Sequence, residues 1–303
     1  MEKIKGAVSV IIPTYKGSDK IERAVKSVIN QTYQSTEVIV VDDNGLGTEA
    51  QTETEKAIEQ FKSLDNFKYI PHDKNKNGAT ARNTGINASK GEYLCFLDDD
   101  DEYLPHKVES QVREFEKLDE SYGMMVGSVK IIEGNYESVH RGGYKHDFLY
   151  EYLSHQVGAC SSTVMVRSNV LEIVKGWDES FRRHQDWEFF ARVAASFKVC
   201  CIDDIGVLKY KYDNNLPKDG KVAEEYRAHY LNKMKPLIER YTSRQQKKIY
   251  FSNYIDVGKV YLKNKNIKDA IRLAFMAKSP IRAFGAYIAD GARYFRKMRI
   301  VKG

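Results

Sequence analysis

The first hundred residues alternate between short apolar runs and stretches of helical periodicity. Residues 7–13 (AVSVIIP) and 37–41 (EVIVV) are rich in β-branched apolar side chains, which is typical of buried strands. Between these runs the apolar residues recur at helical spacing, at Ile21, Ala24, Val25, Val28 and Ile29. Asp19, with Glu22 three residues later, predicts a capping arrangement at the start of this helix. The alternation predicts an α/β fold with a mostly parallel sheet flanked by helices.

The same alternation continues along the chain and then gives way to a helical end. It predicts a helix over 48–64, a strand over 67–70, a helix over 79–88, a strand over 93–97, strands over 122–132 and 161–167, and a helix over 186–197. Beyond about residue 212 the sequence becomes polar and then helical, without an internal repeat. We therefore expect a main domain over residues 1–212 and a helical carboxyl-terminal region over 213–303.

Polar residues follow three of the predicted strands. The first strand ends in Pro13-Thr14-Tyr15, the second in Asp42-Asp43-Asn44, and the strand over 93–97 in four consecutive aspartates, Asp98 to Asp101. Ligands of open α/β sheets bind outside the carboxyl ends of the strands, so these residues are expected at the mouth of one cleft. A dinucleotide cofactor is disfavoured, because no G-x-G-x-x-G turn follows the first strand.

The aspartate run has two interpretations. Four neighbouring carboxylates repel one another, and where water is partly excluded they either hold protons or bind a cation. Mg²⁺ and Mn²⁺ take oxygen ligands and complete their coordination with substrate phosphates, which makes a divalent metal site the first interpretation. The second is a solvated acidic turn, since runs of charge are common in exposed loops.

Composition places the chain among globular proteins. Of its 303 residues, 42% are hydrophobic and 30% are charged, which argues against a disordered or fibrous protein. No apolar stretch reaches the roughly 18 residues of a membrane-spanning helix, and the first apolar run ends at Pro13 without a small-residue cleavage site. The four cysteines include no C-x-x-C pair and lie in strand-like runs. We therefore expect a cytoplasmic protein with reduced, buried thiols.

The positive charge is concentrated at the carboxyl end. The whole chain carries a net +6, but residues 263–303 contain eleven Lys or Arg and two Asp, a net of +9, which leaves −3 for residues 1–262. From Ile281 onward, one face of a helix would gather Phe284, Ile288, Gly291, Ala292 and Phe295, and the opposite face Arg282, Arg293, Arg296 and Lys297. Such a helix can lie on an anionic membrane surface, or it can pack on the rest of the protein or on a second copy in a homodimer.

Five blocks, in order, carry a resemblance to a known family. They are VSVIIPTYK (8–16), EVIVVDDN (37–44), NGATARNTGI (77–86), GEYLCFLDDDDEYLP (91–105) and GWDESFRRHQDWEFF (176–190). Together they closely resemble the family 2 inverting glycosyltransferases, which have the nucleotide-sugar-binding GT-A fold. The resemblance covers residues 7 to about 210 and implies that residues 1–212 form the GT-A catalytic domain, with a helical extension behind it that carries no such block.

The resemblance implies a nucleotide site at the strand ends. It assigns Pro13, Thr14 and Tyr15, together with Asp43, to the base and ribose, and a carboxylate such as that of Asp43 can accept the N–H of a uracil ring. It assigns Arg82, near the start of its predicted helix, to the diphosphate, which a guanidinium and free backbone N–H groups can bind. Taken alone, Asp43 would be interpreted as a turn or cap residue, and Arg82 as a surface ion-pair partner.

The D-x-D motif of the family falls on the aspartate run. The resemblance implies that Asp100 is the metal ligand, whereas Asp98 or Asp99 contacts the ribose or a metal-bound water. The metal, Mn²⁺ or Mg²⁺, would neutralise the diphosphate and make the departing nucleotide a better leaving group. The run holds one aspartate more than the motif requires, so the division of roles stays open.

The catalytic base is expected at the start of the helix that follows residues 176–179. Inversion by a single displacement requires a base that takes the proton of the acceptor hydroxyl. In this family the base is commonly the Asp of a Glu-Asp pair, which makes Asp186 the candidate, although Gln185 replaces the Glu. His184 and Trp187 are candidates for acceptor contacts. Without the resemblance, Asp186 would be interpreted as a helix-start charge and Trp187 as a core residue.

The sequence leaves three functions to distinguish. The leading hypothesis is a metal-dependent, inverting hexosyl- or N-acetylhexosaminyl-transferase that moves a sugar from a UDP-sugar to a glycan or lipid-linked acceptor in bacterial surface polysaccharide assembly, at the inner face of the plasma membrane. A sugar-phosphate nucleotidyltransferase would open with a glycine-rich basic loop, which residues 11–19 do not form. A non-catalytic scaffold is disfavoured by the intact Asp43, Asp98, Asp100 and Asp186. No nucleic-acid partner is expected.

Overall fold

The computed structural model describes residues 3–142, 147–210, 219–277 and 279–289. The chain forms two compact units. The first unit comprises residues 1–131, 138–145 and 159–210, and the second comprises 132–137, 146–158 and 211–303. The domain boundary between residues 212 and 213 stays a prediction.

A nine-stranded sheet forms the framework of the first unit. Four parallel strands lie in the order β3 (Phe67–Pro71), β2 (Thr36–Asp42), β1 (Ile4–Thr14) and β4 (Gly91–Phe96). The order continues through β8 (Val164–Arg167), β6 (Tyr122–Glu133), β9 (Lys198–Tyr210) and β5 (Asp101–Tyr103), while β7 (Tyr136–His140) pairs with β6. β8 is antiparallel to both β4 and β6, and β5 is antiparallel to β9.

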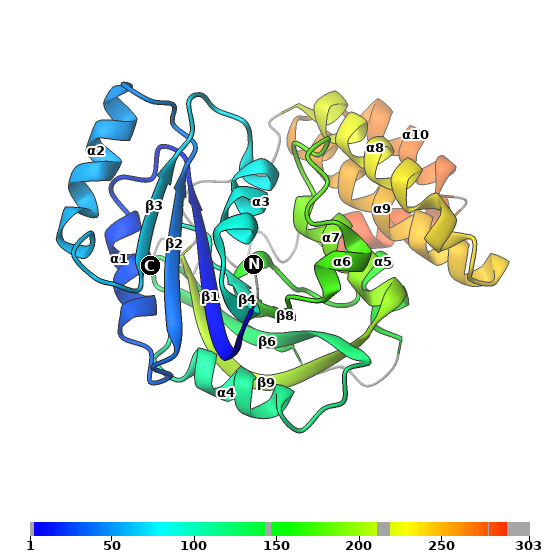
Figure 1. The fold of residues 1–303 in the computed structure, drawn as a ribbon. Coiled ribbons are helices and arrows are strands. Elements are labelled where there is room, and N and C mark those ends of the chain that lie inside the picture. Colours follow the sequence, from blue (N-terminus) through cyan, green and yellow to red (C-terminus); the bar gives the residue numbers. More distant parts are fainter. Residues whose placement is uncertain (1–2, 143–146, 211–218, 278, 290–303) are drawn as a thin grey trace. The chain divides into compact units, whose positions relative to one another are not determined.

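Helices cover both faces of the parallel strands, as Figure 1 shows. Alternate residues of a strand point to opposite faces. One face of β1 and β2 packs with α1 (Ile21–Ile29) in a cluster that contains Val8, Val10, Ile12, Val38 and Val40. The other face of β2 packs with Ala81 of α3 (Gly78–Ala88), through Ile39 and Val41. Burial on both faces explains why these strands are continuous apolar runs in the sequence.

The remaining helices divide between the two units. The first unit has α2 (Glu49–Ala57), η1 (Glu59–Phe61), α4 (Lys107–Phe115), η2 (Ser161–Thr163), α6 (Val170–Val174) and α7 (Gln185–Ser196). The second has α5 (Phe148–Leu153), α8 (Gly220–Ile238), α9 (Ser243–Lys263), α10 (Ile267–Met276) and a helix over 280–289. Among the described helices, none has the length and apolarity needed to cross a membrane.

Most elements predicted from periodicity are confirmed, and two of the differences lie at helix ends. The capping arrangement of Asp19 and Glu22 is wrong, because α1 begins after Lys20 and its start has no side-chain cap. The helix predicted over 48–64 ends at Ala57, and a 3-10 turn follows it. α3 begins after Asn77, whose side chain accepts hydrogen bonds from the backbone N–H groups of Ala79 and Thr80.

Candidate active site

The carboxyl ends of β1, β2 and β4 lie side by side, because these strands are parallel neighbours. β1 ends at Thr14, β2 ends at Asp42, and the aspartate run follows β4. The backbone joins these ends: the Asp43 N–H donates to the Thr14 carbonyl at 2.9 Å, and the Leu97 N–H donates to the Ile11 carbonyl at 3.0 Å. The sequence segments predicted to meet at one edge of the sheet therefore do meet.

A hydrogen bond to Asp99 connects the aspartate run to the end of β1. The Thr14 hydroxyl donates to its carboxylate at 2.6 Å. A Cβ on Gly17 would lie 2.0 Å from the same carboxylate, so a side chain at this position would displace Asp99. Burial, together with the charges of Asp100 and Asp98, raises the pKa of Asp99 to about 6.

Asp98 is held by two cations and a hydroxyl. Arg82 Nη2 lies 2.7 Å and the Ser161 hydroxyl 2.8 Å from its Oδ1, and Lys209 Nζ lies 3.6 Å from its Oδ2. Burial opposes ionisation, but Lys209, Arg82 and Ser161 outweigh it and lower the pKa of Asp98 to about 2. This carboxylate is therefore ionised and already paired.

Asp101 is fully buried and also paired. Lys209 Nζ lies 2.9 Å from one of its oxygens, and the Ser162 hydroxyl donates to the same oxygen at 2.6 Å. The two charges face each other because Asp101 and Lys209 are register partners across β5 and β9. Burial works against the charge of Lys209, but its anionic neighbours, Asp98 and Asp101 among them, raise its pKa.

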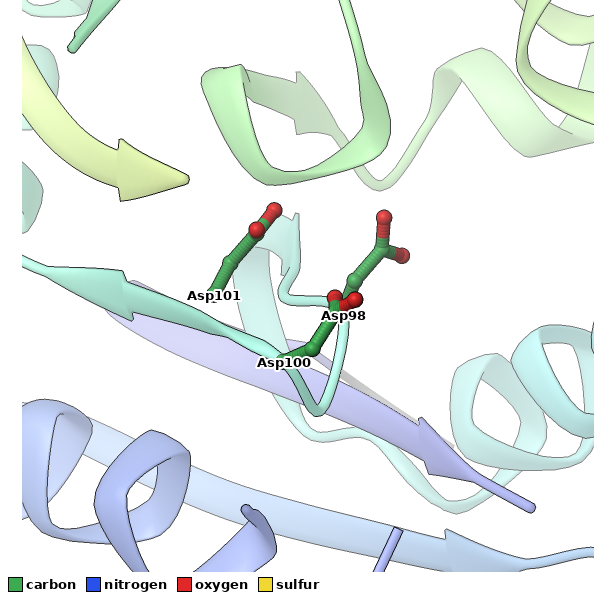
Figure 2. Close-up of side chains that lie close together, drawn as sticks. All are labelled: Asp98, Asp100 and Asp101. Carbon is green, nitrogen blue, oxygen red and sulfur yellow. The ribbon is translucent and has the colours of Figure 1, made fainter. Parts of the chain in front are cut away.

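Asp100 differs from its three neighbours. Its backbone carbonyl accepts a hydrogen bond from Arg23 at 2.8 Å, but no side chain among the described residues donates to its carboxylate. Burial, and next the charge of Asp98, raise its pKa. Asp98, Asp100 and Asp101 each place an oxygen within 4.8 Å of the others, and Figure 2 shows these three side chains extending from one short stretch of chain. Such a set of carboxylate oxygens fits a hard divalent cation.

Arg82 connects the aspartate run to the start of α7. Besides its ion pair with Asp98, its Nη1 donates to the Gln185 side chain at 3.1 Å, and its guanidinium lies 4.8 Å from the centre of the Trp177 ring. The Nε–H of Arg82 is buried and finds no acceptor within the part of the chain that the structure describes. A buried donor without an acceptor is costly, so this group is suited to a phosphate oxygen of a ligand.

Asp186 lies in the first turn of α7, next to Gln185. Its Oδ1 accepts a hydrogen bond from the Trp187 N–H at 3.0 Å. Burial, and next the negative charge of Asp98, raise the pKa of Asp186 to about 6. A carboxylate with this pKa is ionised at neutral pH and still basic enough to accept a proton.

Asp43 has its hydrogen-bonding capacity filled by the loop before α3. Its two oxygens accept from the Lys76 N–H at 2.8 Å, the Asn77 N–H at 2.9 Å and the Asn75 amide at 2.9 Å, and His72 Nδ1 lies 2.7 Å away. The side chain is also almost fully buried. In this structure Asp43 therefore orders the loop that leads into α3, and a base could reach its oxygens only by displacing one of these donors.

The other residues predicted to bind ligands lie in different surroundings. Thr14 is buried, whereas the Tyr15 side chain is 50% exposed, and Pro13 lies opposite Val41 in the β1–β2 register. The rings of His184 and Trp187 stack, with centroids 4.6 Å apart. Both side chains are half-buried. An exposed Tyr and a half-buried aromatic pair near α7 are compatible with ligand contacts.

Comparison with known proteins identifies the family. The model of the family described as "Glycosyl transferase family 2" matches residues 9–172, more than half of the chain. The chain belongs to this family. This glycosyltransferase is 30% identical over 243 residues to the amylovoran biosynthesis glycosyltransferase AmsB of Erwinia amylovora, a match that covers 77% of this chain and 79% of AmsB. The predicted family and enzyme class are confirmed.

Two solved structures support the fold of the glycosyltransferase. TarS of S. aureus in complex with UDP-GlcNAc superposes with a TM-score of 0.59 at 15% identity, over 90% of this chain and 92% of that chain. The mannosyltransferase PcManGT of Pyrobaculum calidifontis, in complex with GDP-Man and Mn²⁺, gives the same TM-score and identity over 100% and 85%. The predicted GT-A fold is confirmed.

Sequence reasoning missed several residues of this glycosyltransferase site. Lys209 lies in a strand that the sequence did not predict, and Ser161 and Ser162 lie in a 3-10 turn before β8. His72 lies between β3 and α3 without a motif around it. The aspartate run itself indicates that a cation lies nearby, because four adjacent carboxylates repel one another. The sequence does not reveal which of the many lysines is that cation.

Proposed function

We propose that this family 2 glycosyltransferase is an inverting enzyme that uses a nucleotide sugar, with UDP as the nucleotide, and transfers a hexosyl or N-acetylhexosaminyl group to a hydroxyl of a glycan or lipid-linked acceptor. The assembly of bacterial surface polysaccharide is the proposed setting, since AmsB is an amylovoran biosynthesis enzyme. UDP is proposed because TarS, a structure of the same fold, is in complex with UDP-GlcNAc. The observation that carries the proposal is the position of Arg82, whose guanidinium donates to Asp98 of the aspartate run at 2.7 Å and to Gln185, the neighbour of Asp186, at 3.1 Å.

The donor site is proposed along the strand ends. Pro13, Thr14 and Tyr15, with the loop that Asp43 orders, would hold the base and ribose. Asp98 and Asp99 would lie on the ribose side, where Asp99 is fixed by Thr14. Arg82 would bind the diphosphate, because its guanidinium is oriented by Asp98 and its buried Nε–H has no acceptor among the described residues.

A divalent cation, Mn²⁺ or Mg²⁺, is proposed beside the diphosphate. The residues fit it: Asp100 offers a carboxylate with no side-chain donor among the described residues, and oxygens of Asp98 and Asp101 lie within 4.8 Å. Because Asp98 and Asp101 are already paired with Arg82 and Lys209, Asp100 is the proposed ligand. When bound, the cation would supply positive charge that stabilises the departing nucleoside diphosphate.

Asp186 is proposed as the catalytic base. It would take the proton of the acceptor hydroxyl as that oxygen forms its bond to the anomeric carbon, while the bond from this carbon to the diphosphate oxygen breaks and its electrons leave with the nucleotide. A single displacement of this kind inverts the anomeric centre. His184 and Trp187, which adjoin Asp186, would contact the acceptor.

The C-terminal helical region is proposed as a separate domain over 213–303, behind a catalytic domain over 1–212. A cytoplasmic enzyme that acts at the inner face of the plasma membrane would meet a lipid-linked acceptor there. The net charge of +9 over residues 263–303 supports an anionic membrane surface as the partner. A homodimer formed by the same region is the competing arrangement.

Calorimetric titration of UDP, GDP and dTDP tests the donor and metal proposals. The wild type, with Mn²⁺ and again with EDTA, is compared with Asp100→Ala and with a control, Asp65→Ala, whose side chain is exposed in the turn before β3. We expect metal-dependent binding of UDP that weakens at least about tenfold in Asp100→Ala and stays unchanged in the control. If no nucleotide binds, the donor proposal is wrong; if UDP binds equally well with EDTA, the metal proposal is wrong.

A further inference from the structure

The last described helices of the second unit expose large apolar side chains. The side chains of Phe275 and Met276 at the end of α10 are 63% and 44% exposed, and those of Ile281, Phe284 and Ile288 are 87%, 43% and 73% exposed. The last three recur at spacings of three and four residues, so they share one side of the helix over 280–289. We call Ile281, Phe284 and Ile288 the apolar face. Exposed apolar groups of this size mark interaction surfaces.

The opposite side of the same helix is already packed. Ala283 and Tyr287 are buried in the core of the second unit, together with Leu273 and Ala274 of α10. The Tyr287 hydroxyl donates to the carbonyl of Ala270 at 3.2 Å. These contacts fix the rotation of the helix, so it cannot turn its exposed side inward without removing Tyr287 from the core.

The packing of Tyr287 also prevents the helix over 280–289 from rotating about its axis. Its ring lies against Gly258 of α9, where an added Cβ would be only 1.9 Å from the Tyr287 hydroxyl oxygen. Within the described part of the second unit, the helix over 280–289 therefore packs through one side and exposes the apolar face. Packing of this face on the core of its own unit, one of the alternatives open from the sequence, is disfavoured.

The charge of this region distinguishes the two remaining partners of the apolar face, a second copy of the chain and an anionic lipid surface. Residues 263–303 carry a net +9, and the exposed Arg282 lies within the same helix as the apolar face. Two copies meeting through this face would bring two such regions together and repel each other. An anionic lipid surface instead offers negative headgroups to the basic residues and an acyl boundary to the apolar ones.

We infer that the apolar face of Ile281, Phe284 and Ile288 docks on an anionic lipid bilayer and inserts to the depth of the headgroup boundary. The basic residues of the same region contact lipid phosphates. This inference adds a binding partner to the proposed function and rests on it in one respect. Lipid docking is useful to the enzyme because the proposed lipid-linked acceptor would lie at the same surface.

Vesicle flotation tests the inference with the full-length protein. Vesicles of phosphatidylcholine mixed with phosphatidylglycerol are compared with vesicles of phosphatidylcholine alone. The test variant is Ile281→Ser with Ile288→Ser, and the matched control is Ile173→Ser, an isoleucine of α6 in the first unit that is 61% exposed. We expect the wild type and the control to float with the anionic vesicles only, and the double variant to bind at least about tenfold more weakly.

Two further measurements keep the result unambiguous. Because the replaced isoleucines are exposed, the double variant should unfold at the temperature of the wild type; if it does not, Arg282→Glu replaces it and is expected to weaken anionic-vesicle binding several-fold. The molar mass in solution is measured by light scattering for each protein. Equal vesicle binding by the wild type and the double variant overturns the inference. So does a dimer that the double substitution dissociates, because the face would then be a subunit interface.

UDP titration of the same proteins separates this inference from the proposed function. The apolar face contains none of the residues assigned to the nucleotide, so UDP affinity should be equal in all three proteins. A protein that floats with anionic vesicles but binds no nucleotide would contradict the proposed function and leave the lipid-docking inference intact.

Discussion

At the residue scale, the four adjacent aspartates have four different environments. Asp99 is hydrogen-bonded to Thr14, Asp98 is paired with Arg82, and Asp101 is paired with Lys209. Only the Asp100 carboxylate lacks a side-chain donor among the described residues. The run itself could be predicted to need cations, because like charges repel. Its division of roles could not, because the partners come from 16, 85 and 108 residues away.

The raised pKa of Asp186 predicts how the transfer rate depends on pH. A base must be ionised to accept a proton, and burial together with the charge of Asp98 raises its pKa to about 6. Protonation as the pH falls below about 6 therefore removes the base, and kcat should fall about tenfold for each further pH unit. Steady-state transfer rates at saturating donor, measured from pH 5 to pH 8 (roughly spanning this pKa), check the profile.

Asp186→Asn is the control for this pH profile. The variant should bind UDP as the wild type does, since no nucleotide contact is assigned to the residue, and should lose transfer by at least about a hundredfold. Asp99 also has a pKa of about 6, so UDP affinity is measured across the same pH range to separate donor binding from proton transfer. Near wild-type transfer by Asp186→Asn would show that another group is the base.

At the element scale, the sequence predicted β1, β2 and β4, whose side chains are mostly buried, and missed β5, β7 and β9. β1, β2 and β4 are continuous apolar runs, which periodicity detects. β5 is Asp-Glu-Tyr, and β9 is only partly buried, with Asp203 and Asp204 in its middle. β5 is a strand because the backbone of β9 pairs with it, and this long-range pairing leaves no local pattern.

The pairing of β5 with β9 predicts the effect of replacing Lys209. Lys209→Met leaves the fully buried Asp101 without its cation, and removing one partner of a buried ion pair typically costs about 3–5 kcal/mol. Burial already raises the pKa of Asp101 to about 7, so the carboxyl should take up a proton and relieve part of this cost. We expect the free energy of unfolding to fall by about 3 kcal/mol, because the Lys209 side chain is 30% exposed and water can partly replace it. Urea denaturation followed by fluorescence measures the change.

A double-mutant cycle distinguishes this charge effect from a loss of packing. Adding Asp101→Asn to Lys209→Met removes the unpaired carboxylate, and an amide can still contact the Ser162 hydroxyl. The double variant should therefore recover a large part of the lost stability. A double variant as unstable as the sum of the two single variants would mean that the ion pair itself contributes nothing to the edge of the sheet.

At the scale of the whole molecule, the sequence was informative for one unit and much less so for the other. The ordered blocks between residues 8 and 190 predicted the family and the GT-A fold, both of which are confirmed. The helical end carries no such block, and its periodicity places Phe284 and Ile288 on one face without revealing whether that face is covered. Whether the face is exposed depends on Tyr287 packing against Gly258, a contact between residues 29 positions apart. The part of the predicted amphipathic helix beyond Ala289 lies outside the described residues.

The uneven charge of the chain predicts a salt dependence that separates the two contributions to lipid binding. With +9 over residues 263–303 and −3 over the rest, attraction to anionic vesicles is screened as the Debye length falls from about 10 Å at 0.1 M salt to 3 Å at 1 M. Vesicle affinity of the wild type should fall at least about tenfold over this range, measured by flotation. The Ile281→Ser/Ile288→Ser variant keeps every charge, so it should show the same slope from a lower starting affinity. A variant whose binding no longer responds to salt would mean that the basic residues reach the lipid only after the apolar face has inserted, and that the two contributions are not independent.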